Sequence, residues 1–385
     1  MLFATRFVRL FAYGSLSVIL VFYLTGLGLS DQQVGLLLTL TLAGDTVVSL
    51  ILTTQADRIG RRRMLIAGAL LMAGAGLAFA STRNFLFLVI AGTIGVISPS
   101  GNEVGPFLPI EQAALSEIIP SAKRTNVFAW YTLMGTVATA LGALAGGLVT
   151  QTLPRSVVIF AYSAFGLLLA MLFLQLSPRA EAAPAGERPR FGVGASRGVV
   201  LRLSGLFALD AFGGGFVVQS FAAYWFYLRF GVSPAALGGI FFGANVFAGL
   251  SALAASRLAA RFGLVKTMVY THLPSNILLI LVPLMPNLGL AIVMLLLRFS
   301  ISQMDVPTRQ SYTMAIVRPE ERSAAAGVLG VARTTGAAIA PVFAGLLFAH
   351  PRLINLPFFI AGLLKIGYDV LVYRAFVNRP VAGEQ

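Results

Sequence analysis

The sequence predicts an all-α membrane protein whose twelve transmembrane helices form two parallel six-helix repeats. Three observations support this fold class: an extreme apolar composition, a regular series of long apolar segments, and motifs that recur in the two halves. The chain of 385 residues is 57% hydrophobic and only 11% charged, with a mean hydropathy of +0.86. A water-soluble fold could not bury this much apolar surface, so we expect the protein to cross a lipid bilayer several times.

Twelve apolar segments follow one another along the chain, most of them separated by short polar loops. A helix rises about 1.5 Å per residue, so about 20 residues cross the hydrocarbon core of a bilayer. The first segment alone could be a signal peptide, but the series of later segments indicates a retained first helix. The expected spans are Leu10 to Leu27, Gln33 to Leu52, Leu65 to Ala80, Phe85 to Ile119, Val127 to Leu148, Val157 to Leu176, Val199 to Leu228, Ala235 to Leu258, Val265 to Met285, Leu288 to Val317, Ala324 to Phe348 and Leu356 to Val377.

The fourth span is too long and too interrupted to be one regular helix. Pro99, Pro106 and Pro109 lie within it, and Asn102 and Glu103 lie between the prolines. Proline removes a backbone donor and clashes with the preceding helical turn. We therefore expect a kinked or partly unwound helix, which a membrane protein tolerates where it faces protein or a water-filled cavity.

The segment 177–198 is the one extended polar stretch, and it contains three prolines and several charged residues. This composition is typical of a linker. The sequence therefore predicts an N-terminal six-helix bundle at 1–176, a linker at 177–198 and a C-terminal six-helix bundle at 199–385.

The net charge of +14 would suggest a nucleic-acid partner for a soluble chain. Here most cations lie in the expected inter-helix loops of one side, including Arg6 and Arg9 ahead of the first span. The opposite side holds only Arg83, Arg155, Arg229 and Arg352. Cytoplasmic loops of membrane proteins are rich in Lys and Arg, so both termini and the linker are expected in the cytoplasm and no nucleic acid is expected. We expect a plasma-membrane location, which is the inner membrane in a bacterium.

Short motifs recur in the two halves at matching positions. Ala56 to Gly60 corresponds to Ala259 to Gly263, and Pro109 to Gln112 corresponds to Pro307 to Gln310. Repeats of six helices related by an axis along the membrane normal account for this pattern.

The polar stretch between the second and third spans carries a specific motif. The sequence runs Thr-Thr-Gln-Ala-Asp-Arg-Ile-Gly-Arg-Arg-Arg-Met from Thr53 to Met64. Gly60 provides a backbone position that tolerates a positive φ, so two helices can reverse direction within a few residues. The stretch resembles the signature loop of the major facilitator superfamily, Gly-x-x-x-Asp-Arg/Lys-x-Gly-Arg/Lys-Arg/Lys, with Thr53 in place of the first glycine. The matching residues are Asp57, Arg58, Gly60, Arg61 and Arg62.

This resemblance implies a transporter that works by alternating access, with spans one, four, seven and ten around a central cavity. In the family, Asp57 would face the N-terminus of span eleven, whose partial positive charge favours a carboxylate. A second pattern, Gly142-Ala143 with Gly146-Gly147, resembles the Gly-Pro-x-x-Gly-Gly signature of proton-driven exporters, with Ala143 in place of proline. Close packing of small residues between membrane helices explains the second pattern equally well.

Four acidic residues inside the spans are candidates for proton coupling: Glu103, Asp305, Asp210 and Asp45. A charged side chain deep in a membrane costs roughly 2.5 to 3.5 kcal/mol, so it needs a partner, water or a function. Glu103 is the first candidate because it lies in the broken fourth span. Asp210 precedes three glycines that predict a helix interruption. The alternative is that these carboxyl groups are hydrogen-bonded structural elements.

Glu111 and Arg309 occupy equivalent positions in the two repeats, which places them at equal depth on spans four and ten. They are therefore a candidate ion pair that closes a cytoplasmic gate. The alternative is that each residue pairs within its own half.

Candidate substrate-binding residues are the membrane cations Arg298 and Arg333, together with Asn102, Tyr224 and Trp225. The arginines could bind an anion or neutralise Asp305. The aromatic residues could stack an organic substrate or belong to an interfacial belt. Lys365 and Asp369 lie four residues apart on one helix and are expected to pair with each other.

These features predict a secondary active transporter and not an enzyme. The chain has no cysteine and only two histidines, and it lacks a phosphate-binding loop, so no metal, cofactor or direct ATP drive is expected. We expect proton-coupled export of a small organic compound, with protons and the lipid bilayer as further partners. The alternatives are proton-coupled uptake or facilitated diffusion of an organic anion, and lipid translocation. These features predict no particular oligomeric state.

Overall fold

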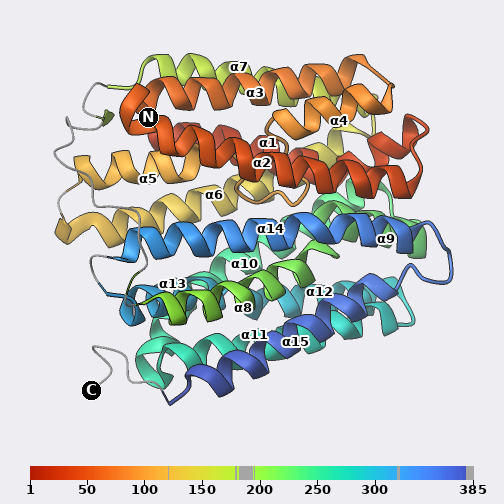
Figure 1. Ribbon diagram of the computed structural model, residues 1–385. Helices are drawn as coiled ribbons and strands as arrows, with labels where there is room; N and C mark the ends of the chain where they lie inside the picture. Colours follow the sequence, from red (N-terminus) through yellow and green to blue (C-terminus); the bar gives the residue numbers. More distant parts are fainter. Residues whose placement is uncertain (120, 178–179, 182–193, 195, 319–320, 379–385) are drawn as a thin grey trace. The chain divides into compact units, whose positions relative to one another are not determined.

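The computed structural model describes residues 1–119, 121–177, 180–181, 194, 196–318 and 321–378. These residues form fifteen α-helices, labelled α1 to α15, and no strand occurs among them (Figure 1). Within this part of the chain, eleven helical segments are long and apolar enough to cross a membrane. The expectation of a polytopic, all-helical membrane protein is therefore confirmed.

The chain divides into two compact units, Met1–Arg188 with Val218–Phe242, and Pro189–Val217 with Gly243–Gln385. In the first unit, α1 packs on α6, α3 on α7 and α2 on α4, and α9 also contacts α1. The helices of the first unit are α1 (Leu2–Gly26), α2 (Asp31–Ile59), α3 (Arg61–Ser81), α4 (Phe85–Ile94), α5 (Phe107–Ile118), α6 (Ser121–Val149), α7 (Ser156–Leu174), α9 (Gln219–Phe230) and the first part of α10 (Pro234–Phe262).

The second unit has a corresponding set of helix pairs. Here α8 packs on α14, as α1 packs on α6, and α11 packs on α15, as α3 packs on α7. The helices of the second unit are α8 (Arg197–Gly215), the rest of α10, α11 (Leu264–Leu281), the short 3₁₀ helix η2 (Val282–Leu284), α12 (Leu288–Ser302), α13 (Asp305–Ile316), α14 (Arg322–Phe348) and α15 (Leu356–Phe376).

Glycines bring α1 and α6 close together. A Cβ atom added to Gly142 would lie 2.0 Å from the carbonyl oxygen of Phe11, and one added to Gly146 would lie 2.5 Å from that of Ser15. Gly14 makes the reverse contact, since its Cβ would lie 2.1 Å from the carbonyl oxygen of Thr139. In this structure the small residues of the fifth span are therefore packing residues between membrane helices.

The predicted break in the fourth span is confirmed. Helix α4 ends at Ile94 and α5 begins at Phe107, and the twelve residues between them are not helical. Tyrosine side chains hydrogen-bond two carbonyl groups of this stretch: Tyr162 donates to Val96 over 2.7 Å, and Tyr13 donates to Val104 over 3.2 Å. The buried backbone of the break thus finds partners in neighbouring helices, as a hydrocarbon environment requires. The helix interruption predicted after Asp210 is also present, because α8 ends at Gly215 and α9 begins at Gln219.

One glycine makes the whole turn between α2 and α3. Gly60 has a φ of 117°, and the equivalent Gly263, between α10 and α11, has a φ of 83°. Both values lie in the region that glycine adopts without steric cost. The remainder of the polar stretch is helical, since α2 continues to Ile59 and α3 begins at Arg61. Polar residues do not by themselves end a helix, so the second span extends beyond its predicted end at Leu52.

The first helix begins earlier than expected. Helix α1 starts at Leu2, so Arg6 and Arg9 lie within it, where they are 7% and 0% exposed. The prediction that both are loop cations ahead of the first span is therefore wrong. The sequence-based start at Leu10 was too late because the first turns of α1 contain two arginines, which are not typical of a membrane span.

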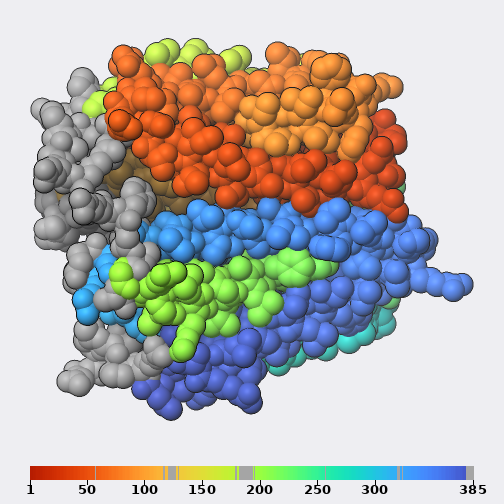
Figure 2. Space-filling model, in the orientation of Figure 1, coloured from red at the N-terminus to blue at the C-terminus, as the bar shows by residue number. Residues whose placement is uncertain are grey.

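Large apolar side chains lie at the surface of the first unit. Leu86 and Phe87 of α4 are 64% and 63% exposed, and Leu50, Ile51 and Leu70 are also exposed. Figure 2 shows this face of α2, α3 and α4 in red and orange. An apolar surface of this kind is suited to contact with lipid tails.

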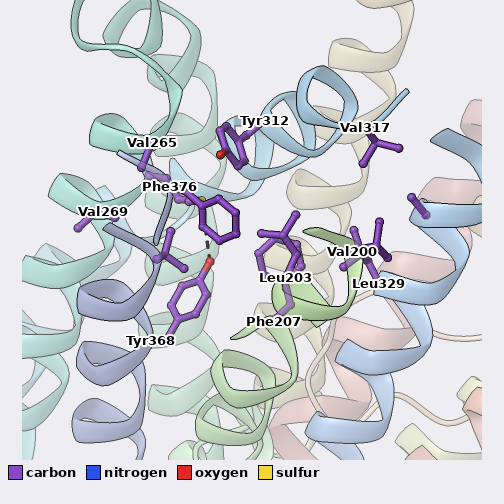
Figure 3. Close-up of a cluster of buried hydrophobic side chains, with 13 residues drawn as sticks. Val200, Leu203, Phe207, Val265, Val269, Tyr312, Val317, Leu329, Tyr368 and Phe376 are labelled. Carbon is purple, nitrogen blue, oxygen red and sulfur yellow. Dashed lines mark hydrogen bonds between the residues drawn. The ribbon is translucent and has the colours of Figure 1, made fainter. Parts of the chain in front are cut away.

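A hydrophobic cluster lies at one end of the second unit, where α8, α11, α13, α14 and α15 meet (Figure 3). Phe207, Met268, Tyr312, Leu329 and Tyr368 each come from a different one of these helices. Figure 3 shows Phe207 and Tyr368 pointing toward the same apolar space. About one turn from these five residues, the same helices carry Asp210, His272, Arg309, Arg333 and Lys365.

Candidate functional site: buried charge clusters in the two units

The first unit contains a cluster of four charged side chains around Arg9. Arg9 donates from Nη1 and Nη2 to the two carboxylate oxygens of Glu111, over 3.0 and 2.7 Å. Its Nε donates to Oε1 of Glu103 over 2.7 Å. Such two-pronged contacts between a guanidinium and a carboxylate are among the stronger hydrogen bonds in proteins. Both Arg9 and Glu111 are 0% exposed.

Further contacts complete this cluster. Arg6 Nη1 lies 3.1 Å from Oε2 of Glu103. Thr5 donates to Oε1 of Glu111 over 2.8 Å, and the hydroxyl of Tyr131 donates to Oε2 of the same residue. Two arginines therefore face two glutamates and the cluster is neutral. Glu103 has a side chain 15% exposed, compared with 0% for Glu111.

Asp45 and Asn102 belong to the broken span. Asp45, on α2, accepts a hydrogen bond of 2.8 Å at Oδ1 from the backbone N–H of Gly105, whose φ is 79°. The carbonyl oxygen of Asn102 accepts from the Ser98 hydroxyl over 2.7 Å, and the Asn102 side chain is exposed. Asp45 therefore holds the non-helical backbone in place, which is the structural alternative left open by the sequence.

Asp210 lies at the centre of a second cluster, in the second unit. Lys365 Nζ donates to its Oδ1 over 2.6 Å, and Arg309 Nη1 donates to its Oδ2 over 3.1 Å. The same Arg309 nitrogen lies 3.2 Å from Oδ2 of Asp305. Helices α8, α13 and α15 thus bring together acids and bases that are up to 155 residues apart in sequence.

His272 extends this cluster to Asp369. His272 Nδ1 lies 2.8 Å from Oδ1 of Asp369, and His272 Nε2 lies 3.6 Å from Oδ1 of Asp210. The side chain of Asn276 donates to Oδ2 of Asp369 over 3.0 Å. The predicted pairing of Lys365 with Asp369 is therefore wrong. Helix α15 packs on both α8 and α11, so each residue finds a closer partner on another helix.

Arg298 and Arg333 are half-buried cations without a close acidic partner among the described residues. Among the described residues, neither has a carboxylate oxygen within 4 Å, and the buried Nε of each has no hydrogen-bond partner. Both nevertheless interact electrostatically with Asp210 and Asp305, and Arg333 is repelled by Arg309. The second cluster contains four Arg and Lys side chains and three aspartates, so positive charge exceeds negative charge.

The candidate gate residues lie in different units. Glu111 contacts Arg9, Thr5 and Tyr131 in the first unit. Arg309 contacts Asp210 and Asp305 in the second unit. These contacts match the alternative in which each residue pairs within its own half, and the gate itself stays a prediction.

The two candidate aromatic residues are packed against other aromatic rings on α9 and α1. The rings of Tyr224 and Phe22 lie 5.8 Å apart, centroid to centroid. Trp225 is 0% exposed, with its ring 4.9 Å from that of Phe226 and 5.7 Å from that of Phe230. In this structure both residues contribute to helix packing.

The signature turn has a partner that the sequence did not indicate. Glu181 accepts hydrogen bonds from the backbone N–H groups of Arg61, over 2.7 Å, and Arg62, over 3.2 Å. It thus caps the N-terminus of α3, where backbone donors are free and the helix dipole favours negative charge. Arg58 is exposed, and the side chain of Asp57 lies outside the described part of the structure.

Sequence reasoning missed four members of the clusters: Arg6, Arg9, Tyr131 and His272. Arg9 and Thr5 are four residues apart and therefore lie on one face of a helix, which is a signal that the first helix continues upstream of Leu10. His272 is one of only two histidines and lies in the middle of an apolar span, which also marks it. No local pattern identifies their partners.

Known proteins resemble this chain in sequence. The uncharacterized membrane protein YJR124C of Saccharomyces cerevisiae is 31% identical, over 98% of this chain and 94% of its own length. The quinolone resistance protein NorA of Staphylococcus aureus is 25% identical over 46% of this chain and 44% of its own length.

Two solved structures have the same fold at low sequence identity. A bacterial homologue of the human lysosomal transporter Spinster, in an inward-facing and occupied conformation, matches with a TM-score of 0.74 and 17% identity over 98% of this chain and 96% of its own. The nucleoside transporter NupG matches with a TM-score of 0.75 and 14% identity over 98% of both chains. The family model described as Major Facilitator Superfamily matches residues 2–304. With its membrane-spanning helices and its signature turn at Gly60, this chain therefore belongs to the major facilitator superfamily of membrane transporters.

Proposed function

We propose that this transporter exports a small organic compound in exchange for protons, by alternating access between two six-helix halves. In this proposal, α4 and α5 together form one interrupted span, which gives twelve spans with halves at 1–176 and 199–385 and a linker at 177–198. The corresponding helix pairs of the two units support parallel repeats. The excess of cations on one side supports cytoplasmic termini in a plasma membrane.

The two buried charge clusters are the observation that carries this proposal. Replacing a buried ion pair by apolar residues is often neutral or stabilising, so ion pairs inside a membrane protein are weak evidence of a structural need. Ionisable residues within membrane helices mark ion and substrate pathways by default. Glu103 is the first candidate for proton coupling because it combines partial exposure with two arginine partners that compete for its charge.

Protonation of Glu103 would remove its charge and release Arg6, whereas Arg9 would keep its two bonds to Glu111. The proton would thereby change the charge at the break between α4 and α5. This gives a physical link between a proton and the backbone of a broken span, where a change of shape disturbs few helical hydrogen bonds.

Flux in proteoliposomes with an imposed pH gradient tests the proposal, with organic cations, anions and neutral compounds as probes. We expect gradient-driven flux in the wild type and its loss in Glu103→Gln, with substrate exchange retained. Gradient-driven flux that persists in Glu103→Gln moves the proton site to Asp305, Asp210 or Asp45. A substrate flux that is the same with and without the pH gradient contradicts proton coupling.

A second candidate function is the transport of an organic anion, which the positive excess of the second cluster favours. Arg298 and Arg333 have no acid within ion-pair distance among the described residues, and a carboxylate or phosphate group of a substrate could supply it. Arg298→Gln and Arg333→Gln should then weaken transport of anions selectively. Equal effects on anionic and neutral probes contradict an anion site.

The Glu111 and Arg309 gate remains part of the proposal, with a defined test. If the two residues pair directly in one state of the transport cycle, reversing both charges should preserve transport while each single reversal damages it. If the double reversal reduces transport as much as each single reversal does, the two residues do not form a gate. The pair Arg9 and Glu111, reversed together, is the matched control for pairing within the first unit.

A further inference from the structure

Asp369 is a fully buried carboxylate that has no lysine or arginine partner in the described part of the chain. Its side chain is 0% exposed, and its partners among the described residues are His272 and Asn276. An ionised carboxylate in a protein interior needs a compensating charge. The nearest lysine on its own helix, Lys365, is bound to Asp210 instead. Asp369 and His272 must therefore satisfy each other.

Protonation of His272 would allow its imidazole to donate hydrogen bonds to both neighbouring carboxylates. Neutral imidazole has one N–H and one lone pair, whereas each nitrogen of His272 faces a carboxylate oxygen: Nδ1 faces Asp369 and Nε2 faces Asp210. Protonated His272 donates from Nδ1 to Asp369 and directs its second N–H toward Asp210. A neutral imidazole that keeps its proton at Nδ1 still donates to Asp369, but its Nε2 lone pair then faces the carboxylate of Asp210. Only the protonated imidazole suits both acids.

We propose that His272 and Asp369 form a proton-binding site of the second unit, which takes up and releases one proton. The site is separate from the carboxylates of the first unit, and its role in transport rests on the proposed function. Its charged and titratable surroundings come from the neighbouring helices: Asp210 on α8, Arg298 on α12, Asp305 and Arg309 on α13, Arg333 on α14, and Lys365 and Tyr368 on α15.

The hydrophobic cluster of Figure 3 closes one end of this site. Met268 lies one turn before His272, and Tyr368, next to Asp369, directs its hydroxyl to the sulfur of Met268 over 3.8 Å. The imidazole ring of His272 packs edge-on against Tyr368 at 5.7 Å. On the other side of the imidazole lies Asp210, whose carboxylate also binds Lys365 and Arg309. Loss of the proton changes the balance of charge at that shared acid.

The chain has only two histidines, which makes the site directly observable. A His350→Gln variant labelled with ¹⁵N-histidine, in lipid nanodiscs, presents His272 as the sole imidazole. We expect its two ring nitrogens to titrate together between pH 5 and 9, and the proton affinity of the imidazole to fall about tenfold in the further variant Asp369→Asn. An imidazole that keeps one protonation state over the whole range, in the variant with Asp369 intact, overturns the proposal.

Transport assays distinguish failure of this site from failure of the proposed function. If His272 titrates but no probe shows gradient-driven flux in wild-type proteoliposomes, the proton site stands and proton-coupled transport fails. If flux is gradient-driven but His272 does not titrate, the function stands and the site is wrong. With both intact, His272→Gln should lose gradient-driven flux while His350→Gln keeps it, and full flux in His272→Gln excludes a role for the site in coupling.

Discussion

At the scale of single residues, each unit contains a buried ion pair between two corresponding helices, and the positions of the acid and the base are exchanged between the two units. In the first unit an arginine on α1, Arg9, holds an acid on α5, Glu111. In the second unit an acid on α8, Asp210, holds an arginine on α13, Arg309. The paired elements are the first and fourth of each half in the expected arrangement. A charged pair of this kind links two helices strongly, since each partner is buried and loses its compensation if the other moves.

Glu111 should matter more for stability than Glu103. Glu111→Gln leaves Arg9 with a neutral partner in a site that is 0% exposed, so we expect a loss of about 3 kcal/mol or more in the free energy of unfolding. Glu103→Gln leaves the two bonds between Arg9 and Glu111 in place and should cost about 1 kcal/mol. Thermal unfolding in detergent micelles, followed by circular dichroism, measures both. Equal losses would show that Glu103 supplies as much of the compensating charge as Glu111.

At the scale of elements, close helix packing and helix breaks have different structural roles. Glycines let α1 approach α6, and Gly215 and Gly336 let α8 approach α14. The break between α4 and α5 lies instead where polar side chains gather, among them Asp45 and Glu103. Close packing makes a helix pair stiff, whereas a break leaves backbone groups that need side-chain partners. Each half therefore combines a rigid pair with an interrupted element.

A methyl group at the α1 and α6 contact should disrupt that pair. Gly142→Ala places a Cβ 2.0 Å from a backbone oxygen, so the helices must separate, at an expected cost of about 1 to 3 kcal/mol. Gly74→Ala is the matched control, because nothing lies within 4 Å of its Cβ in α3 and alanine favours a helix. Melting temperatures in the same detergent provide the measurement. An unchanged melting temperature for Gly142→Ala would show that α1 and α6 are looser than this contact indicates.

The one-residue turn at Gly60 should not accept alanine. Its φ of 117° is outside the range that residues with a Cβ adopt readily, so Gly60→Ala should strain the joint between α2 and α3 by about 1 to 3 kcal/mol. We expect a lower melting temperature and a shift in the accessibility of cysteines placed in α3. Gly327→Ala, at a helical position in α14 with open space around the Cβ, is the control. A melting temperature equal to that of the control would mean that the turn relaxes without strain.

At the scale of the whole molecule, the topology depends on whether α4 and α5 together form one membrane span. This determines the number of spans and the side of the membrane on which each loop lies. Helix α4 has only ten residues, about 15 Å at 1.5 Å per residue, which is half of the hydrocarbon thickness. The twelve residues between α4 and α5 and the twelve of α5 itself supply the missing length. The proposed twelve-span topology therefore depends on this broken element.

The absence of cysteine makes this topology directly testable. Single cysteines can be placed at Thr82, before α4, and at Ile119, after α5, in an otherwise cysteine-free chain. In intact cells, a maleimide that does not cross membranes should label Thr82→Cys from outside and should reach Ile119→Cys only after the membrane is opened. Labelling of both from the same side would show that α4 and α5 do not form a span, and would leave an odd number of crossings.

The sequence by itself determined the class of protein, most of its helices and the places where backbone geometry is special. Apolar runs longer than the bilayer core define spans, three prolines define the break in the fourth span, and Gly60 defines a turn, because each is a local property of neighbouring residues. The motif at Asp57 to Arg62 also pointed to the superfamily. Local patterns were misleading where charge interrupts an apolar run, as at Arg6 and Arg9 in α1.

Only the tertiary structure decided which charges are partners. Lys365 lies four residues from Asp369 but binds Asp210, 155 residues away in sequence, and Arg9 binds Glu111 across 102 residues. A sequence restrains the distance between residues three or four apart on one helix, whereas contacts between helices depend on how their faces pack. Burial then favours these pairs, because a charge removed from water is stabilised by a nearby opposite charge. For this reason the proposed proton site at His272 can be recognised only when α8, α11 and α15 are assembled.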